Sequence, residues 1–312
     1  MKKTEVVNCP ICSSLNFSKL LISRTERIPA LKTYISICKD CGHLMSNPWP
    51  TKIEYQKINA VWYKFKFDNE PINLNSETKF IRWDDMWHRV SNYIVKKPLN
   101  ILDIGSGNGS AIEYLRKKIP DINAHVIEQY KDNWKYLRTL GCKIYNIDIE
   151  NMGWSRTIKK KFDFIIFRHT LEHVKSVNSI LIEISNLLNK TGMAYIVVPD
   201  SMGIKQKNIK TSFFRPVHLH YFNIENFKFI CLKNKLNPII VSRDEKNKKN
   251  SEIYGLFKKS YSSYNKKFKN NYETQLNYIL EKIKKNFWTD FLIILKIEIK
   301  LIINWKNSRN KM

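Results

Sequence analysis

The stretch "NILDIGSGNGS", residues 100–110, decides the fold, because an apolar run stops abruptly in closely spaced glycines. Such a run predicts a strand, then a tight turn, then the start of a helix. Glycine lets the backbone approach a ligand closely and take positive φ values. The helix that follows offers free N–H groups and a positive dipole end. We therefore expect a small molecule with an anionic or polar end at this turn.

Strands and helices alternate on both sides of this turn. The sequence predicts strands at 100–104, 123–129, 142–148, 162–167 and 193–199. It predicts intervening helices at 110–118, 130–140 and 176–189, the last closed by "NKTG". Two further segments, 237–244 and 251–259, read as a β-hairpin at the end of the sheet. This alternation indicates βαβ units and a parallel α/β sheet covered on both faces.

The 312 residues are enough for one full α/β domain and a smaller part. Composition divides the chain into four segments, which are a cysteine-containing head at 1–50, an aromatic helical connector at 51–96, the α/β domain at 97–259 and a basic helical tail at 260–312. The N-terminus lacks an apolar core of signal-peptide length, and no apolar stretch is long enough to span a membrane. These features predict a cytoplasmic protein.

The head contains two closely spaced cysteine pairs, Cys9/Cys12 and Cys38/Cys41. Two C-x-x-C turns can bring four thiolates into a tetrahedron around Zn²⁺, which would form a zinc ribbon. A redox pair and unbound thiols are the alternatives. Four cysteine ligands leave no open coordination position, so the expected role is structural.

The formal net charge is +26. Such a charge is compatible with a surface for nucleic acid or anionic membrane. Lysine greatly outnumbers arginine, and asparagine and isoleucine are abundant, so compositional bias explains the charge equally well. Charge alone leaves both interpretations open.

The glycine turn differs from the common phosphate-binding motifs. Gly105, Gly107 and Gly109 follow a G-x-G-x-G order, whereas the dinucleotide fingerprint is G-x-G-x-x-G and the P-loop ends in Gly-Lys-Ser/Thr. Asp103 precedes the turn, and an acid there suits a ligand with positive charge or donors. Glu128, at the end of the second strand, can accept from both hydroxyls of a ribose.

Four motifs in order, "LDIGSGNG", "VIEQ", "NIDIE" and "FDFIIFRHTLEHV", resemble a class I S-adenosylmethionine (SAM)-dependent methyltransferase over residues 97–259. The resemblance implies a Rossmann-like, doubly wound, seven-stranded sheet whose seventh strand runs against the others. It implies that Asp103 contacts the methionine amino end, Glu128 holds the ribose, and Asp148 and Ile149 flank the adenine. The full set of implied cofactor-binding residues is Asp103, Gly105, Ser106, Gly107, Gly109, Glu128, Gln129, Asp148, Ile149 and Arg168.

The segment after the fourth strand departs from one branch of that family. Amide-methylating members carry Asn/Asp-Pro-Pro-Tyr/Phe there, whereas this chain has "FRHTLEHV", which argues against methylation of an amide or base amine of that kind. His169, Glu172 and His173 match the inverted zinc-protease pattern H-x-x-E-H. We reject a protease, because the pattern lies at a strand end instead of on a helix crossing a cleft. Glu172 and His173 are expected to bond to the backbone.

A hydroxyl acceptor loses a proton on methylation, and histidine is the usual base near neutral pH. His169 follows the fourth strand, at the edge where open α/β sheets bind ligands. The segment "FRPVHLHYF", 214–222, follows the fifth strand and resembles a stretch of methyltransferases of small molecules and sugars. The candidate catalytic residues are His169, His218, His220 and Tyr221, with a packed histidine pair as the alternative for the last segment.

Zinc ribbons before a SAM domain occur in sugar methyltransferases of surface-glycan or natural-product pathways and in ribosomal RNA methyltransferases. The cysteine head together with H-x-H-Y-F resembles the first group. The chain is shorter than sugar C-methyltransferases, so a hydroxyl oxygen is the expected target. We expect a sugar, sugar nucleotide or glycan acceptor in polysaccharide biosynthesis, with RNA as the alternative.

The tail, 271–311, is basic and helical. An apolar stripe is formed by Phe291, Leu292, Leu295, Ile299 and Ile302. A basic amphipathic helix of this kind can lie on the inner face of a membrane. Packing on the domain, or in a homodimer, is the alternative.

Overall fold

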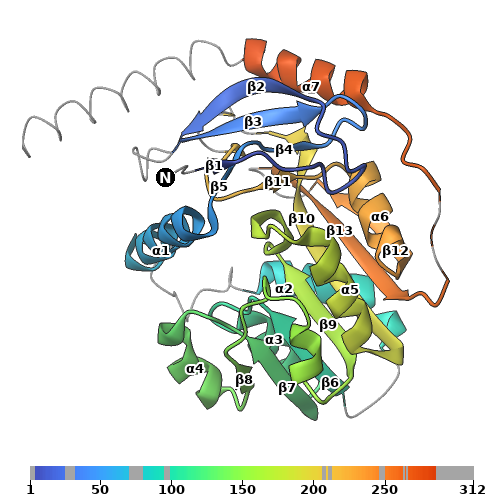
Figure 1. Ribbon diagram of the computed structural model, residues 1–312. Helices are drawn as coiled ribbons and strands as arrows, with labels where there is room; N and C mark the ends of the chain where they lie inside the picture. Colours follow the sequence, from blue (N-terminus) through green and yellow to red (C-terminus); the bar gives the residue numbers. More distant parts are fainter. Residues whose placement is uncertain are drawn as a thin grey trace, which may run out of the picture.

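The computed structural model of the chain describes residues 4–24, 32–69, 80–94, 99–205, 209, 213–245, 250–262, 264 and 266–285 (Figure 1). Within these ranges the chain forms a large seven-stranded sheet, a four-stranded sheet and a two-stranded pair. No helix in the described ranges is long and apolar enough to cross a membrane.

The seven-stranded sheet confirms the predicted Rossmann-like fold. Its strand order is β12-β13-β10-β9-β6-β7-β8. The strands are β6 (Leu99–Ile104), β7 (Ile122–Ile127), β8 (Lys143–Tyr145), β9 (Phe162–Arg168), β10 (Leu188–Ile204), β12 (Leu236–Asp244) and β13 (Asn250–Lys259). Strand β13 is antiparallel to both of its neighbours, whereas β6 to β10 pair in parallel. The strand that the resemblance expects to run against the others is therefore β13.

Strands β10 and β8 differ most in extent from the prediction. Strand β10 begins at Leu188, directly after the preceding helix, with a register shift between Leu188 and Met193. The "NKTG" segment is therefore part of an irregular strand start and not a separate stop. Strand β8 is shorter than the predicted 142–148, as is common for a strand at the edge of a sheet.

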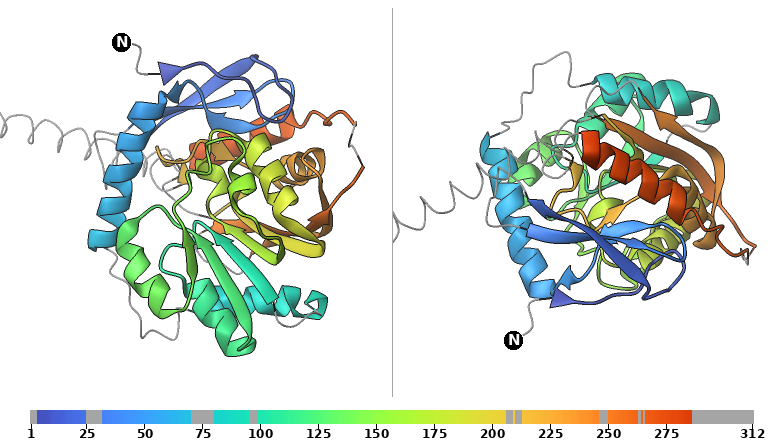
Figure 2. Two further views of the ribbon diagram at one scale, coloured as in Figure 1. Left: turned by 60° about the horizontal axis from the view of Figure 1, so that its bottom comes forward. Right: turned by 90° about the horizontal axis from the view of Figure 1, so that it is seen from above.

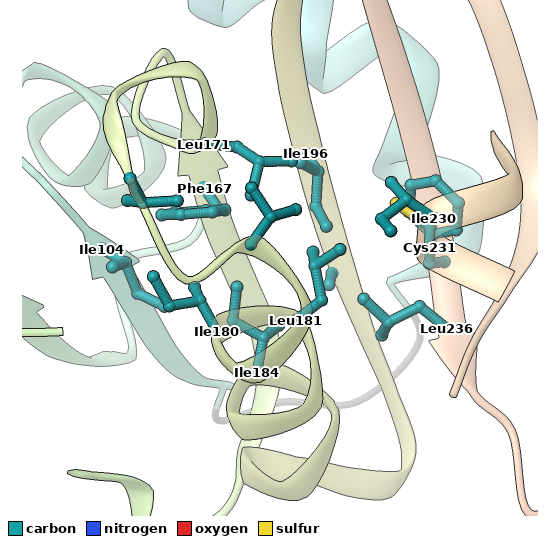
Figure 3. Close-up of a cluster of buried hydrophobic side chains, with 14 of the residues drawn as sticks. Ile104, Phe167, Leu171, Ile180, Leu181, Ile184, Ile196, Ile230, Cys231 and Leu236 are labelled. Carbon is teal, nitrogen blue, oxygen red and sulfur yellow. The ribbon is translucent and has the colours of Figure 1, made fainter. Parts of the chain in front are cut away.

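Helices cover both faces of this sheet. Successive side chains of a strand point to opposite faces, so the apolar side chains of these strands need a helical layer on each face. The helices of the α/β region are α3 (Ser110–Lys118), α4 (Trp134–Thr139) after the 3₁₀ turn η3 (Lys131–Asn133), α5 (Val177–Leu187) and α6 (Ile224–Lys233). On one face, α5 presents Ile180, Leu181 and Ile184 toward β9 and β10, and all three side chains are fully buried (Figure 3). On the other face, α3 packs over Ile101 and Phe164.

The described part of the connector contains two α-helices, and the second belongs to the core of the large sheet. Helix α1 (Lys52–Asn69) follows β5 (Trp49–Pro50). Helix α2 (Ile81–Val90), followed by η2 (Ser91–Tyr93), buries Trp83, Met86 and Val90 in the same core as α3. Trp83 also donates its indole N–H to Ser110 Oγ at 3.0 Å. The second half of the connector therefore packs against the large sheet.

The N-terminal sheet has the order β11-β4-β3-β2. Its strands are β2 (Phe17–Arg24), β3 (Lys32–Cys38), β4 (Leu44–Ser46) and β11 (His220–Tyr221), and the short β1 (Thr4–Glu5) pairs with β5. Strand β11 belongs to the segment 214–222, for which the sequence predicts no strand. The head therefore shares its sheet with the chain that follows β10 (Figure 1).

The described part of the tail contains helix α7 (Tyr272–Lys285), which lies along β3 at the top of the molecule (Figures 1 and 2). Ile279 is fully buried there with Ile35 and Ile37 of β3. This segment packs on the protein, in agreement with the alternative reading of the tail. The apolar stripe from Phe291 to Ile302 lies outside the described residues.

Candidate active site and cysteine cluster

The glycine turn follows β6 directly, and tertiary packing dictates its first glycine. Gly105 has a φ of 71°. A Cβ at this position would lie 2.6 Å from Thr170 Oγ1, so a side chain is excluded by sterics as well as by backbone conformation. A Cβ at Gly107 would meet no atom within 4 Å. The turn is therefore closed on the Thr170 side and open beside Gly107.

Two polar groups at this turn fit a ligand with hydrogen-bonding groups. Asp103 is 4% exposed, and its carboxylate makes no side-chain hydrogen bond to the residues that the structure describes. Burial, followed by the neighbouring Glu128 carboxylate, raises the pKa of Asp103 to about 7. Ser106 Oγ is buried and has no hydrogen-bond partner among the described residues. A buried carboxylate and a buried hydroxyl of this kind fit the ammonium and polar end of the expected sulfonium cofactor.

Glu128, at the end of β7, is tied to the same turn. Its Oε2 accepts from the Gly107 N–H at 2.7 Å, and its Oε1 accepts from the Tyr130 N–H at 2.7 Å. Each carboxylate oxygen has two lone pairs, so these contacts orient the group while it can also accept from ribose hydroxyls. The predicted ribose ligand and the glycine turn thus form one hydrogen-bonded unit.

The other predicted adenine-side residues follow β7 and β8. Asp148 Oδ1 accepts from the Glu150 N–H at 3.0 Å, which shapes its loop. Ile149 packs against the core. Gln129 is exposed, and its side chain donates to the Ile147 carbonyl at 3.3 Å. The structure places all three after strand ends on the Glu128 side of the sheet, and their contact with adenine stays a prediction.

A dense ionic cluster follows β9. Arg168 Nη2 donates to Glu252 Oε2 at 2.7 Å, and His169 Nε2 lies 2.9 Å from Glu252 Oε1. The other ring nitrogen of His169, Nδ1, lies 3.1 Å from Glu172 Oε1. Burial and Arg168 lower the pKa of His169, but the Glu252 and Glu172 carboxylates outweigh them and raise it above the ordinary value. The imidazole is 31% exposed, so a second molecule can reach it.

This cluster adjoins the glycine turn. His169 has a φ of 51°, and its N–H donates to the Val197 carbonyl of β10 at 3.0 Å. The next residue is Thr170, the side chain that fills the space beside Gly105. His169 is therefore held at the carboxyl ends of the parallel strands, next to the expected cofactor position.

Glu172 and His173 belong to the 3₁₀ turn η5 (Leu171–His173). His173 Nδ1 lies 3.0 Å from the Val217 carbonyl, which confirms the expected backbone contact for this residue. The rings of His173 and His218 meet edge-on, with centroids 4.7 Å apart. Glu172, 1% exposed, instead contacts imidazoles through its carboxylate. The structure thus brings His218 to the β9 segment.

His220 and Tyr221 lie away from the His169 cluster, in strand β11. His220 Nδ1 lies 3.2 Å from His43 Nε2, and burial lowers the pKa of His220 to about 3. Tyr221 donates its hydroxyl to the Arg215 carbonyl at 2.9 Å. Both residues are 1% exposed and lie in β11, within the joint between the two sheets. Their catalytic roles stay predictions, but this geometry favours the packed alternative.

The four head cysteines converge as the spacing predicts. Cys9 Sγ lies 3.5 Å from Cys41 Sγ, and Cys12 Sγ lies 3.5 Å from Cys38 Sγ. A tetrahedral zinc site with Zn–S bonds of about 2.3 Å has sulfur atoms about 3.8 Å apart, so the cluster fits this ion. In each knuckle the first cysteine's carbonyl accepts from an N–H four residues later, that of Ser13 or of Gly42. Both of those residues have a positive φ, 65° and 76°.

Sequence reasoning missed Glu252, and it considered His43 only as a possible substitute metal ligand, not for its contacts with His220 and Asn226. Glu252 is the one acidic residue of strand β13, and that isolation was an available signal. Its pairing with Arg168 and His169 depends on strand order, which brings β13 beside β10. His43 directly follows the second cysteine knuckle, a position that suggests a metal ligand and gives no sign of any other role.

Comparison with known proteins agrees with this geometry. The sequence model of a family described as "Methyltransferase domain" matches residues 76–239. The solved structure of 1,6-didemethyltoxoflavin-N1-methyltransferase from Burkholderia thailandensis, with bound 1,6-didemethyltoxoflavin and S-adenosylhomocysteine, has a TM-score of 0.53 at 14% identity and covers 71% of this chain and 97% of that one. The plantazolicin methyltransferase BamL, in complex with a triazolic desmethylPZN analog and SAH, has a TM-score of 0.51 at 17% identity and covers 66% and 92%. A search of curated proteins finds no match.

Proposed function

Because this chain belongs to the family of methyltransferase domains and is a SAM-dependent methyltransferase, we propose that it methylates a hydroxyl oxygen of a sugar, a sugar nucleotide or a glycan intermediate. The observation that carries this proposal is the adjacency of the glycine turn and the His169 cluster through the contact between Gly105 and Thr170. That adjacency supports a role for His169 as a proton acceptor beside the methyl donor.

The cofactor side of the reaction uses the residues around the glycine turn. When bound, SAM supplies an electrophilic methyl group. Asp103 accepts from its ammonium group, and Glu128 accepts from the ribose hydroxyls while the Gly107 and Tyr130 N–H groups hold the carboxylate in place. Asp148, Ile149 and Gln129 are the proposed adenine contacts. Ser106 Oγ, which lacks a partner among the described residues, supplies one further polar contact.

The acceptor side uses the segment after β9. His169 is held by two carboxylates, so its ring has a fixed orientation toward the acceptor. We propose that His169 takes the hydroxyl proton on one ring nitrogen, which exchanges its carboxylate partner for the acceptor hydroxyl, while the carboxylate that stays bonded to the other ring nitrogen stabilises the resulting imidazolium. Arg168, which donates twice to Glu252, holds that carboxylate in place as well as bordering the cofactor. Alignment of acceptor and donor supplies most of the rate.

The sugar class rests on the two features shared with sugar methyltransferases, the cysteine head and the H-x-H-Y-F stretch. Strand β11 of that stretch pairs with β4, which follows the second cysteine knuckle, so the two features form one structural unit. We propose that the four cysteines hold a structural zinc ion that keeps this unit assembled. Zinc analysis of the purified protein should find close to one ion per chain, and far less would remove this part of the proposal.

The acceptor is tested by transfer of labelled methyl from SAM into a host extract. The products are separated into RNA, lipid-linked and small soluble fractions, and the Asp103→Asn variant is the control for enzyme-dependent label. Label in the sugar-nucleotide or lipid-linked fraction supports the proposal. Ribonuclease-sensitive label would overturn it and favour RNA, for which the net charge of +26 is the supporting observation.

A further inference from the structure

Glu172, His173 and His218 form a second cluster with metal-ligand chemistry, separate from the four cysteines. One carboxylate oxygen and one ring nitrogen from each histidine lie within 4.8 Å of one another. Two imidazoles and one carboxylate are the donor set of sites that bind divalent first-row transition metals and leave further coordination positions open. The set differs from the protease-like pattern in the sequence, because His218 takes the place of His169.

The carboxylate of Glu172 gives an independent sign that something is bound here. The residue is 1% exposed, and its Oε2 atom has no hydrogen-bond partner among the described residues. Its other oxygen, Oε1, lies 3.1 Å from His169 Nδ1 and 3.9 Å from His173 Nε2. A buried carboxylate oxygen without a partner is costly, and a cation beside it removes that cost.

The histidine geometry suits coordination as well. His173 Nδ1 lies 3.0 Å from the Val217 carbonyl, so Nδ1 carries the proton and donates. The lone pair of the neutral ring is then on Nε2, the nitrogen on the Glu172 side. A ligating histidine in proteins typically donates its other ring N–H to a carboxylate or a backbone carbonyl in this way.

Backbone contacts hold the two ligand-bearing segments together before any ion binds. The Leu219 N–H donates to the Glu172 carbonyl at 2.8 Å. Tyr55 Oη lies 2.6 Å from the His173 carbonyl and 2.7 Å from the Val217 carbonyl, so one hydroxyl links both segments. Such scaffolding fixes donor positions without help from the metal.

We propose that Glu172, His173 and His218 bind one divalent transition-metal ion, with its remaining coordination positions open to water or to an oxygen of a second molecule. The ion is of the class that prefers imidazole and carboxylate together, such as Mn²⁺, Fe²⁺, Co²⁺, Ni²⁺ or Zn²⁺. The site shares Glu172 with the proposed base His169, but its test measures metal binding and does not depend on the identity of the acceptor.

The test is a Co²⁺ titration of the full-length, zinc-saturated protein, followed by visible absorption and by metal analysis after desalting. We expect one equivalent of Co²⁺ with weak visible bands and no thiolate charge-transfer absorption, which would mark the cysteines instead. His218→Ala and Glu172→Gln should each weaken binding by more than about tenfold. His88→Ala, at a histidine whose side chain is 75% exposed, is the matched control and should bind as the unchanged protein does.

Circular dichroism of each variant separates loss of the site from loss of the fold. If a variant fails to fold, the stoichiometry of the unchanged protein still decides. The absence of any Co²⁺ beyond the zinc-filled cysteines overturns the proposal, and so does binding that survives His218→Ala in a folded protein.

Discussion

The imidazole rings of His43 and His220 stack with their centroids 5.5 Å apart, and His43 Nε2 lies 3.2 Å from His220 Nδ1. The Asn226 amide, 3.2 Å away, donates to His43 Nδ1. His43 Nε2 therefore carries the ring proton and donates it to His220. This buried chain of polar contacts runs from the end of a cysteine knuckle to helix α6, so the head and the methyltransferase domain share one interior network.

The shared network predicts that the two histidines act as a unit in stability. His43→Ala and His220→Ala should each lower the free energy of unfolding by about 1–3 kcal/mol, because each leaves a buried partner unsatisfied. The double variant should lose less than the sum of the two, by about 0.5–3 kcal/mol. Denaturant unfolding measures all three values, with His88→Ala as the control. Additive losses would show that the contact does not couple the two parts.

The closed side of the glycine turn predicts a steric effect at Gly105. Gly105→Ala puts a methyl group 2.6 Å from Thr170 Oγ1, whereas Gly153→Ala, at a φ of 82°, meets no atom within 4 Å. Both substitutions carry the strain of a left-handed residue, about 1–2 kcal/mol. Gly105→Ala should therefore cost more stability and also weaken binding of S-adenosylhomocysteine. Calorimetric titration and thermal unfolding measure the two effects, and equal behaviour of both variants would contradict the packing described.

The raised pKa of Asp103 predicts pH-dependent cofactor binding. The carboxyl group accepts from the ligand's ammonium only when it is ionised, and its pKa without ligand is about 7. Affinity for S-adenosylhomocysteine should therefore fall as the pH drops through 7, with little change at higher pH until the ligand's own amine titrates. Asp103→Asn should bind more weakly at pH 8 and lose this dependence. Titration calorimetry between pH 6 and pH 8 is the measurement, and a flat profile in the unchanged protein would refute the assignment.

The position of His169 predicts a loss of turnover on its replacement. His169→Asn is the suitable variant, because asparagine tolerates the left-handed backbone found at this residue. Loss of a general base should lower kcat by about 10²–10⁴-fold, with a much smaller change in the affinity for S-adenosylhomocysteine. His218→Asn and His220→Asn in the same assay separate the three candidate bases. Turnover of His169→Asn within a few-fold of the unchanged enzyme would exclude this base.

The strands of the large sheet were predictable because their signals are local. A continuous apolar run bounded by glycine or polar residues identifies β6 and β9 without knowledge of their neighbours. The glycine turn, Asp103 and Glu128 follow from the same runs, because parallel strands place their carboxyl ends at one edge. The two cysteine pairs were likewise readable from spacing alone, and their convergence is confirmed.

The histidine-rich segment was not predictable in the same way. Strand β11 is only two residues long, too short for any periodicity, and its partner β4 lies far away in the sequence. The alternation of His218 and His220 suggests a common side, yet one contacts His173 and the other contacts His43. Pairing of β11 with β4 decides this arrangement, and no local pattern in 214–222 predicts that pairing.

The sequence by itself determined the methyltransferase fold, the glycine turn and the four-cysteine cluster, because each depends on residue spacing within one short segment or on the order of parallel strands. Only the tertiary structure decided that Glu252 contacts His169 and that His218 lies beside Glu172 and His173. It also decided that the head contacts the domain through His43 and His220. These contacts join segments that are remote in sequence, and their geometry arises only when strand order and packing of the whole chain bring those segments together.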